Sequence, residues 1–226
     1  MCCVYIPDSV EIIRKQAFRG CKSLKNIKIP SELTEIKEQA FYNSGIEKID
    51  LSNSLKIIHI FDLAFQDCSN LETVIFPTVF PAVDNYEANF WRIFSGCTSL
   101  NTFAVMENDN DVVVEDNVIY YGDVLLAGVP NNSNKNIVVR EGTTKIYKFA
   151  FLESNIETIV LPDSCNEIGR NAFQYCYSLK KVDLGNGKID LRLEPFDYCS
   201  KEIVILHNGA KCDFNKPSDL TSMTLE

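Results

Sequence analysis

One unit of roughly 22 or 23 residues recurs along most of this chain, and it constrains the fold more than any other feature. The first unit runs from Ile6-Pro7 to Ile29-Pro30, with apolar residues at fixed positions in between. Six copies and a weaker seventh align on an Ala-Phe pair or its substitute, at residues 17–18, 40–41, 64–65, 93–94, 150–151, 172–173 and 195–196. Such repetition predicts a solenoid whose units are stable only when stacked on their neighbours.

The order of residues within one unit indicates how each coil folds. Over the second half of Leu24–Pro30 apolar and polar residues alternate, which is typical of a half-buried strand, and Pro30 ends that strand because it has no N–H to donate. Val10 and Ile13, spaced by three, lead into a segment that predicts a short turn or a helical crossover. Equivalent strands of successive coils would pair in parallel, with the crossovers on the other side.

The overall charge excludes some partners. The net charge of −9 and the pI near 4.8 argue against binding to nucleic acid or to an anionic membrane surface. No apolar run approaches the length of a membrane span, so we expect no membrane insertion. The chain starts Met-Cys-Cys-Val-Tyr, without the features of a signal peptide.

Five of the nine cysteines share one position, three residues after the Ala-Phe pair, and Ser44 and Ser154 fill the same position in other copies. A position that accepts Cys or Ser requires a small side chain, and free cysteine packs as a small hydrophobe. We therefore expect a column of buried thiols rather than disulfides or a metal site. The five residues are Cys21, Cys68, Cys97, Cys176 and Cys199.

The unit Ile-Pro-x-Ser-Val-x-x-Ile-x-x-x-Ala-Phe-x-x-Cys-x-x-Leu-x-x-Ile resembles the BspA-type leucine-rich repeat, also called the treponema pallidum-type repeat. The segment from Val112 to Pro130 resembles a β-hairpin that such proteins carry between repeats, with strands at Val118–Tyr120 and Val124–Leu126. The resemblance implies an α/β repeat solenoid. We expect a leucine-rich-repeat right-handed superhelix with a parallel β-sheet on the concave face, short turns or helical crossovers opposite, and one β-hairpin island.

The repeats also suggest how one continuous solenoid domain is organised. We expect N-terminal repeats over 1–105 with an irregular insertion at 78–92, a β-hairpin island over 106–136, C-terminal repeats over 137–206 and a cap or tail over 207–226. The insertion holds aromatic residues, including Phe90 and Trp91, that either form a contact patch or pack back onto the solenoid.

Residues that alternate with the buried strand positions would line the open face of the sheet, where a protein ligand could dock. Small and apolar residues hold the middle of this face and charged residues its ends, unless the hairpin covers the middle. The candidate protein-binding residues are Asn26, Lys28, Lys48, Asp50, Thr73, Ile75, Thr102, Ala104, Thr158, Val160, Lys181 and Asp183, together with Phe90 and Trp91.

The sequence offers no catalytic, cofactor-binding or metal-ligating constellation. The acidic run 107–111 lacks the glycine and the distal glutamate of an EF-hand loop, which favours a solvated loop. His59 and His207 have no metal-ligand spacing, and no phosphate-binding glycine loop is present. We expect no catalytic residues, no cofactor and no metal.

We therefore expect a non-catalytic scaffold for protein–protein interaction. The family resemblance implies cell-surface adhesion or binding of a host or matrix protein, at the cell surface or after secretion. Three alternatives stay open: a structural stalk of a longer surface protein, an intracellular interaction module, and an enzyme that uses a perturbed Cys, His or carboxylate. The absence of a signal peptide leaves a cytoplasmic location open, and the oligomeric state is not predicted.

Overall fold

The computed structural model describes residues 2–54, 59–76, 93–105, 112–189, 191 and 193–212. These residues form a β-solenoid of about seven turns, with parallel strands and almost no helix. The chain divides into two compact units: unit 1 is Met1–Ile119 with Val129–Asn131, and unit 2 is Tyr120–Gly128 with Asn132–Glu226. Strand β10 (Val118–Tyr121) is divided between them. The sequence-based domain boundaries stay a prediction.

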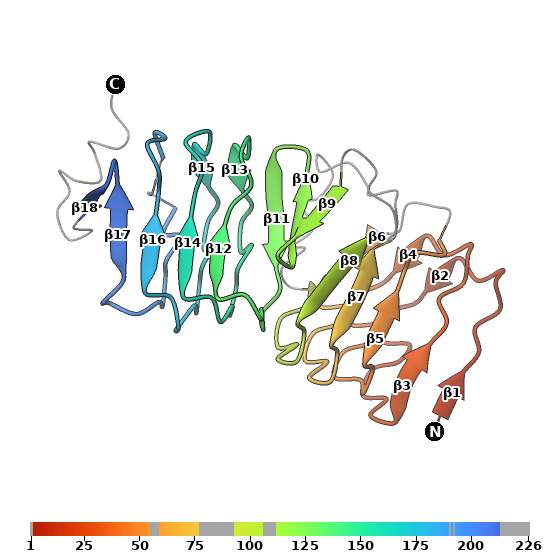
Figure 1. Cartoon of the computed structure of the whole chain (residues 1–226). Helices are drawn as coiled ribbons and strands as arrows, with labels where there is room; N and C mark the ends of the chain where they lie inside the picture. The colour runs from red at the N-terminus through yellow and green to blue at the C-terminus, as the bar shows by residue number, and fades with distance from the viewer. Residues whose placement is uncertain are drawn as a thin grey trace. The chain divides into compact units, whose positions relative to one another are not determined.

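Unit 1 has two ladders of parallel strands, one behind the other (Figure 1). The ladder of longer strands comprises β1 (Cys2–Val4) with β3 (Leu24–Ile27), and β5 (Lys48–Asp50) with β7 (Thr73–Phe76) and β8 (Thr102–Val105). The second ladder, on the crossover side, comprises β2 (Ile12–Ile13), β4 (Glu35–Ile36) and β6 (His59–Ile60). Strand β9 (Val112–Glu115) also belongs to this unit.

Unit 2 repeats this arrangement. One ladder comprises β12 (Asn136–Val138), β14 (Thr158–Val160), β16 (Lys181–Asp183) and β17 (Val204–His207), all parallel, with β18 (Ala210–Cys212) antiparallel to β17. Its crossover side holds β11 (Val124–Gly128), β13 (Lys145–Ile146) and β15 (Glu167–Ile168).

Stacked phenylalanines fill the interior of both units. In unit 1, Phe18, Phe41, Phe65 and Phe94 stack in order, with centroids 5.1, 5.0 and 5.7 Å apart. In unit 2, Phe151, Phe173 and Phe196 do the same at 5.3 and 5.1 Å. Each ring comes from the Ala-Phe position of one coil, so the spacing of the rings follows the spacing of the coils, about 4.8 Å between paired strands. The repeat thus specifies the core.

The crossovers are turns and short strands, and among the described residues only Ile93 is helical. The helical alternative is therefore not confirmed. The physical reason is that two positions in a coil have a left-handed backbone, as at Gln39 (φ 56°) and Asn43 (φ 53°) in the second coil. A left-handed residue interrupts a right-handed helix, so each crossover bends twice instead of winding.

The β-hairpin island is also not confirmed as a separate element. Strand β11 lies in register with β13, pairing Val124 with Lys145 and Leu125 with Ile146. It therefore continues the crossover ladder of unit 2. The insertion 78–92, with Phe90 and Trp91, and the acidic run 107–111 lie outside the described residues. The right-handed superhelix and the concavity of the sheet stay predictions.

Candidate protein-binding face

The outward residues of β5, β7 and β8 form two rows in unit 1, here called the β5–β8 face. Parallel pairing brings Lys48, Thr73 and Thr102 into one row and Asp50, Ile75 and Ala104 into the next. The residues between them point inward, since Ile49, Val74 and Phe103 are buried. All members of the two rows are half-buried or exposed. The alternation along each strand therefore presents six side chains together on one surface.

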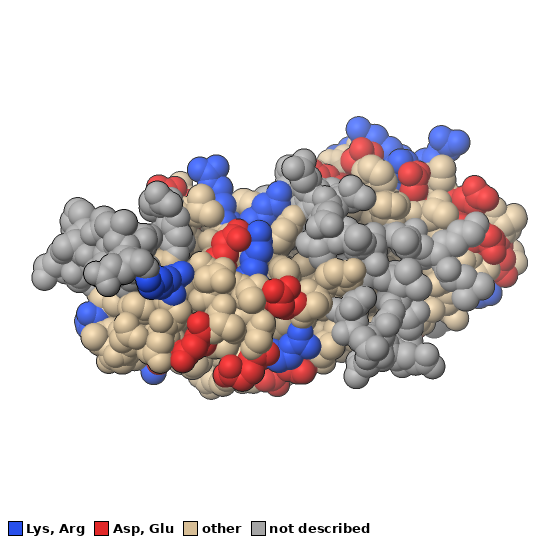
Figure 2. All heavy atoms as spheres, turned by 90° about the horizontal axis from the view of Figure 1, so that it is seen from above, with Lys and Arg blue, Asp and Glu red and all other residues tan. Residues whose placement is uncertain are grey.

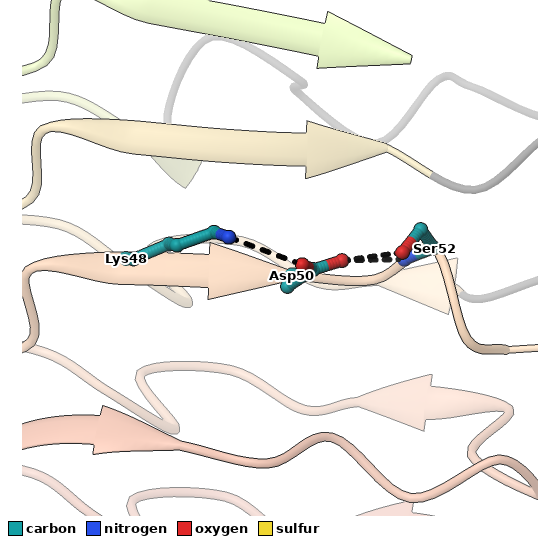
Figure 3. A network of polar contacts seen from close by, with 3 residues as sticks. All are labelled: Lys48, Asp50 and Ser52. Atoms are coloured by element: carbon teal, nitrogen blue, oxygen red, sulfur yellow. Dashed lines mark hydrogen bonds and ion pairs between the residues drawn. The ribbon is translucent and has the colours of Figure 1, made fainter. Parts of the chain in front are cut away.

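Lys48, Asp50 and Ser52 form a network of polar contacts at one edge of this face (Figure 3). The Asp50 carboxylate accepts hydrogen bonds from the backbone N–H of Ser52 at 3.2 Å and from its hydroxyl at 2.5 Å. The Nζ atom of Lys48 lies 3.2 Å from the other carboxylate oxygen of Asp50. Partial burial works to raise the pKa of Asp50, but the hydrogen bonds from Ser52 and the Lys48 ammonium outweigh it and hold that pKa below its ordinary value. Asp50 is therefore held in its ionised form, next to the Lys48 ammonium, whose side chain is 48% exposed.

The remaining candidate residues of unit 1 lie on the neighbouring coil. Asn26, in β3, is exposed. Lys28 follows β3 and lies 3.6 Å from the Asp8 carboxylate. The backbone N–H of Glu47 donates to the carbonyl of Lys25, which places this coil directly beside β5. Asn26 and Lys28 therefore extend the β5–β8 face by one coil.

Unit 2 carries a related surface, here called the β14–β16 face. Parallel pairing places Thr158 beside Lys181 and Val160 beside Asp183, with Ile159 and Val182 buried between them. Lys181 lies 3.8 Å from Asp183, whose carboxylate accepts a hydrogen bond from Gly185 N–H at 3.3 Å. The structure brings Thr73, Ile75, Thr102 and Ala104 together in unit 1, whereas Thr158 and Val160 belong to unit 2. Each unit is therefore a separate candidate surface.

Charges of both signs are interspersed over the described residues of the face seen in Figure 2. Ion pairs also join neighbouring coils, such as Lys25–Glu47 with 2.8 Å between Nζ and Oε1, and Lys180–Glu157 with 2.5 Å between Nζ and Oε2. The Lys180 ammonium holds the pKa of Glu157 below its ordinary value. Alternating charges favour a partner of mixed polarity over a polyanion.

Sequence reasoning did not single out three neighbouring tyrosines of unit 2. The rings of Tyr175 and Tyr198 stack with centroids 5.0 Å apart, and Tyr177 lies 6.0 Å from Tyr175. Tyr177 and Tyr198 are 72% and 61% exposed. One signal was present in the sequence: tyrosine precedes the Cys position in two successive copies, where Gly20 or Asn43 stands in earlier ones.

The described residues contain no group of three or more His, Cys, Asp or Glu side chains that could hold a metal ion. Likewise, none of the helical structure in the described part of the chain is long and apolar enough to cross a membrane.

Comparison with known proteins agrees with the repeat pattern. A family profile described as "BspA type Leucine rich repeat region" matches residues 3–122 and 110–212, in six copies. A search among curated proteins finds no significant match to the sequence.

Several solved structures share the fold. The pneumococcal vaccine antigen PcpA is 19% identical over 81% of this chain and 52% of its own, with a TM-score of 0.56. A leucine rich cell surface protein from Faecalibacterium prausnitzii is 17% identical over 98% of this chain and 62% of its own, with a TM-score of 0.50. A leucine-rich repeat protein from Eubacterium ventriosum is 15% identical over 91% of this chain and 59% of its own, with a TM-score of 0.53. The chain therefore spans less than two thirds of each, and at these identities the likeness shows the fold alone.

Proposed function

Because the chain belongs to the BspA-type leucine-rich-repeat family, we propose that it is a non-catalytic scaffold that binds a protein ligand through the β5–β8 face. The observation that carries this proposal is the register of β5, β7 and β8, which aligns Lys48, Thr73 and Thr102 beside Asp50, Ile75 and Ala104. The family consists of repeat scaffolds, and no enzymatic family is indicated for this chain.

The composition of the face suits a protein partner. Thr73, Thr102 and Ala104 are short, so a ligand could approach the strands closely, and Ile75 offers apolar area that is only half-buried. Lys48 and Asp50 supply charges at one end whose positions are restrained by their ion pair. A surface with an apolar middle and a polar rim is typical of protein–protein interfaces.

We further propose that the ligand is a host or matrix protein and that the chain acts in adhesion at the cell surface. Support comes from the names of two structural relatives, one a vaccine antigen and the other a cell surface protein. Lys28, Asn26, the β14–β16 face, Phe90 and Trp91 are proposed as additional contacts. Labelling of intact cells with a membrane-impermeant reagent tests the location, and labelling only after lysis would favour an intracellular interaction module instead.

The test of binding is capture of purified extracellular matrix proteins by the immobilised chain. The Lys48→Glu variant places a second carboxylate beside Asp50 and should weaken capture by at least about threefold. Lys37→Glu is the matched control, because Lys37 lies on the crossover side and pairs at 2.8 Å with Glu35, two residues away, as Lys48 pairs with Asp50. Equal losses from the two variants, with both folded by circular dichroism, would contradict a role for the β5–β8 face.

A structural stalk is the second candidate. It is favoured by the coverage figures, since the chain spans 52–62% of the three structural relatives. The capture assay separates the two ideas. If a longer protein containing this chain captures a matrix protein and the chain alone captures none, the stalk is the better account.

A further inference from the structure

Two cysteines of unit 2 occupy the same position in successive coils. The backbone N–H of Phe173 donates to Pro195 O at 2.8 Å, which holds the two coils side by side. The Cys176 thiol donates to Phe151 O at 2.9 Å, and the Cys199 thiol donates to Phe173 O at 2.8 Å. Each thiol therefore donates to a carbonyl of the preceding coil in the same way.

This stacking suits a covalent bond between the sulfurs. Cys176 and Cys199 lie outside the strands, but the backbone bonds Phe173 N–H to Pro195 O at 2.8 Å and Tyr175 N–H to Asp197 O at 3.3 Å join their coils as strands are joined, at a spacing of about 4.8 Å. Disulfides accept Cα separations of about 4.4–6.8 Å, so bridging Cys176 and Cys199 requires no large movement of the backbone.

The two thiols differ in access and acidity. Cys199 is half-buried and lines a cavity of about 520 Å³ at the last coil, beside Pro195 and Ile203, whereas Cys176 is fully buried behind it. The neighbouring Cys176 thiol lowers the pKa of Cys199 and outweighs both burial and the nearby Asp197, while burial raises the pKa of Cys176. The reachable sulfur is thus the one that more readily becomes the nucleophilic thiolate.

We propose that Cys199 and Cys176 form a redox-active dithiol that reacts with small-molecule disulfides entering this cavity. In the first step the Cys199 thiolate attacks one sulfur of a disulfide RSSR, forming a mixed disulfide and releasing one thiolate, RS⁻. In the second step Cys176 gives its proton to that thiolate and attacks the Cys199 sulfur, which releases the second RS⁻. Two cysteines are oxidised to one disulfide, and one RSSR is reduced to two thiols.

The chain holds an internal control for this proposal. Cys68 and Cys97 occupy the same position in neighbouring coils of unit 1, where the Cys97 thiol lowers the pKa of Cys68 and burial raises that of Cys97. Both side chains are 0% exposed. This second pair therefore shares the asymmetry in acidity, and Cys68 also has a hydrogen-bond partner in Ser44 at 3.4 Å, but neither of its thiols is exposed. Access is the main difference from Cys176 and Cys199.

The experiment uses the full chain with four other cysteines replaced by serine: Cys2, Cys3, Cys21 and Cys212. Glutathione disulfide is added without oxygen, released glutathione is quantified, and bonds are located by mass spectrometry. We expect two glutathiones per chain and a Cys176–Cys199 bond, formed at least about tenfold faster than any reaction at Cys68 or Cys97. Equal rates at the two pairs, or a reaction that stops at a mixed disulfide on Cys199, would overturn the proposal.

Single serine variants assign the two roles. Serine fits this position, because Ser44 and Ser154 fill it in other coils at 2% exposure, so the variants should fold. Cys199→Ser should release no glutathione, and Cys176→Ser should release one and retain a mixed disulfide on Cys199. Undiminished release from a folded Cys199→Ser variant would also overturn the proposal.

Discussion

The rings of Phe41 and Phe65 stack with their centroids 5.0 Å apart and their planes 8° apart. Both side chains are 0% exposed, and each comes from the Ala-Phe position of its own coil. The contact between coils is therefore made by side chains in the interior as well as by the strand ladders on the two sides. This relationship decides how the stability of the solenoid should respond to mutation.

Replacing Phe41 with alanine should lower the free energy of unfolding by about 3–5 kcal/mol, since it leaves a cavity in a filled core. Phe41 stacks on Phe18 on one side and on Phe65 on the other. Phe18 is only half-buried, so Phe18→Ala should cost less than half as much. Urea denaturation of the two variants measures the difference, and equal losses would contradict the stacked core.

The close approach of two coils at Gly45 gives a second prediction. A Cβ added there would lie 2.0 Å from the carbonyl oxygen of Lys22, a backbone atom that cannot rotate away. Gly45→Ala should therefore destabilise the chain by about 2–3 kcal/mol. Gly20→Ala is the control: its Cβ would meet no atom within 4 Å, but φ is 68°, so it should cost about 1 kcal/mol. Urea denaturation should show a larger loss of unfolding free energy for Gly45→Ala than for Gly20→Ala, and the reverse order would contradict the close approach of the coils at Gly45.

Asp50 predicts a dependence of stability on pH. Its pKa in the folded chain lies below the ordinary value of 3.8, so the unfolded chain binds the proton more readily. The stabilising contribution of the carboxylate is therefore fully present above about pH 5 and is lost as the pH falls through the lower folded pKa. Because the Asp50 side chain is 33% exposed, we expect its carboxylate to contribute less than about 1 kcal/mol to the free energy of unfolding.

Measurement of this effect needs two variants. The difference in unfolding free energy between the wild type and Asp50→Asn should be constant near neutral pH and shrink below about pH 4. Ser52→Ala removes one hydrogen bond to Asp50 and should move its pKa, followed by NMR, upward toward 3.8. A difference that grows on acidification would show that the carboxylate does not stabilise the fold.

The strands and the buried positions could be predicted from the sequence because they depend on local alternation. Ile49, Val74 and Val182 occupy inward positions that the apolar pattern specifies in every copy. Parallel pairing then follows, since the crossovers return each strand to the same side of its coil. The outward rows of the β5–β8 face are a direct consequence of the same period.

The crossovers could not be predicted in the same way. Tyr175 and Tyr198 have left-handed backbones, with φ of 60° and 56°, although bulky residues rarely adopt them. Neighbouring coils impose this conformation through hydrogen bonds such as Tyr175 N–H to Asp197 O at 3.3 Å. Because these bonds join residues far apart in sequence, hydrophobic periodicity does not report them.

The predicted column of buried thiols is confirmed only in part. Cys68, Cys97 and Cys176 are buried, Cys199 is half-buried and Cys21 is exposed. The cause is position along the stack, because Cys21 and Cys199 lie in the first and last copies of the Ala-Phe unit, where a thiol has fewer neighbouring coils to cover it. The sequence shows which cysteines share a position, but the extent of burial depends on the neighbouring coils.

Photo-crosslinking tests the central claim, the protein-binding role of the β5–β8 face, most directly. A photoreactive amino acid is placed at Thr102 in β8, on the face, or at Glu35 in β4, on the crossover side, and the chain is irradiated with the matrix protein that it captures. We predict a crosslink from position 102 and none from position 35. A crosslink from position 35 alone, or equal yields from both, would contradict the account.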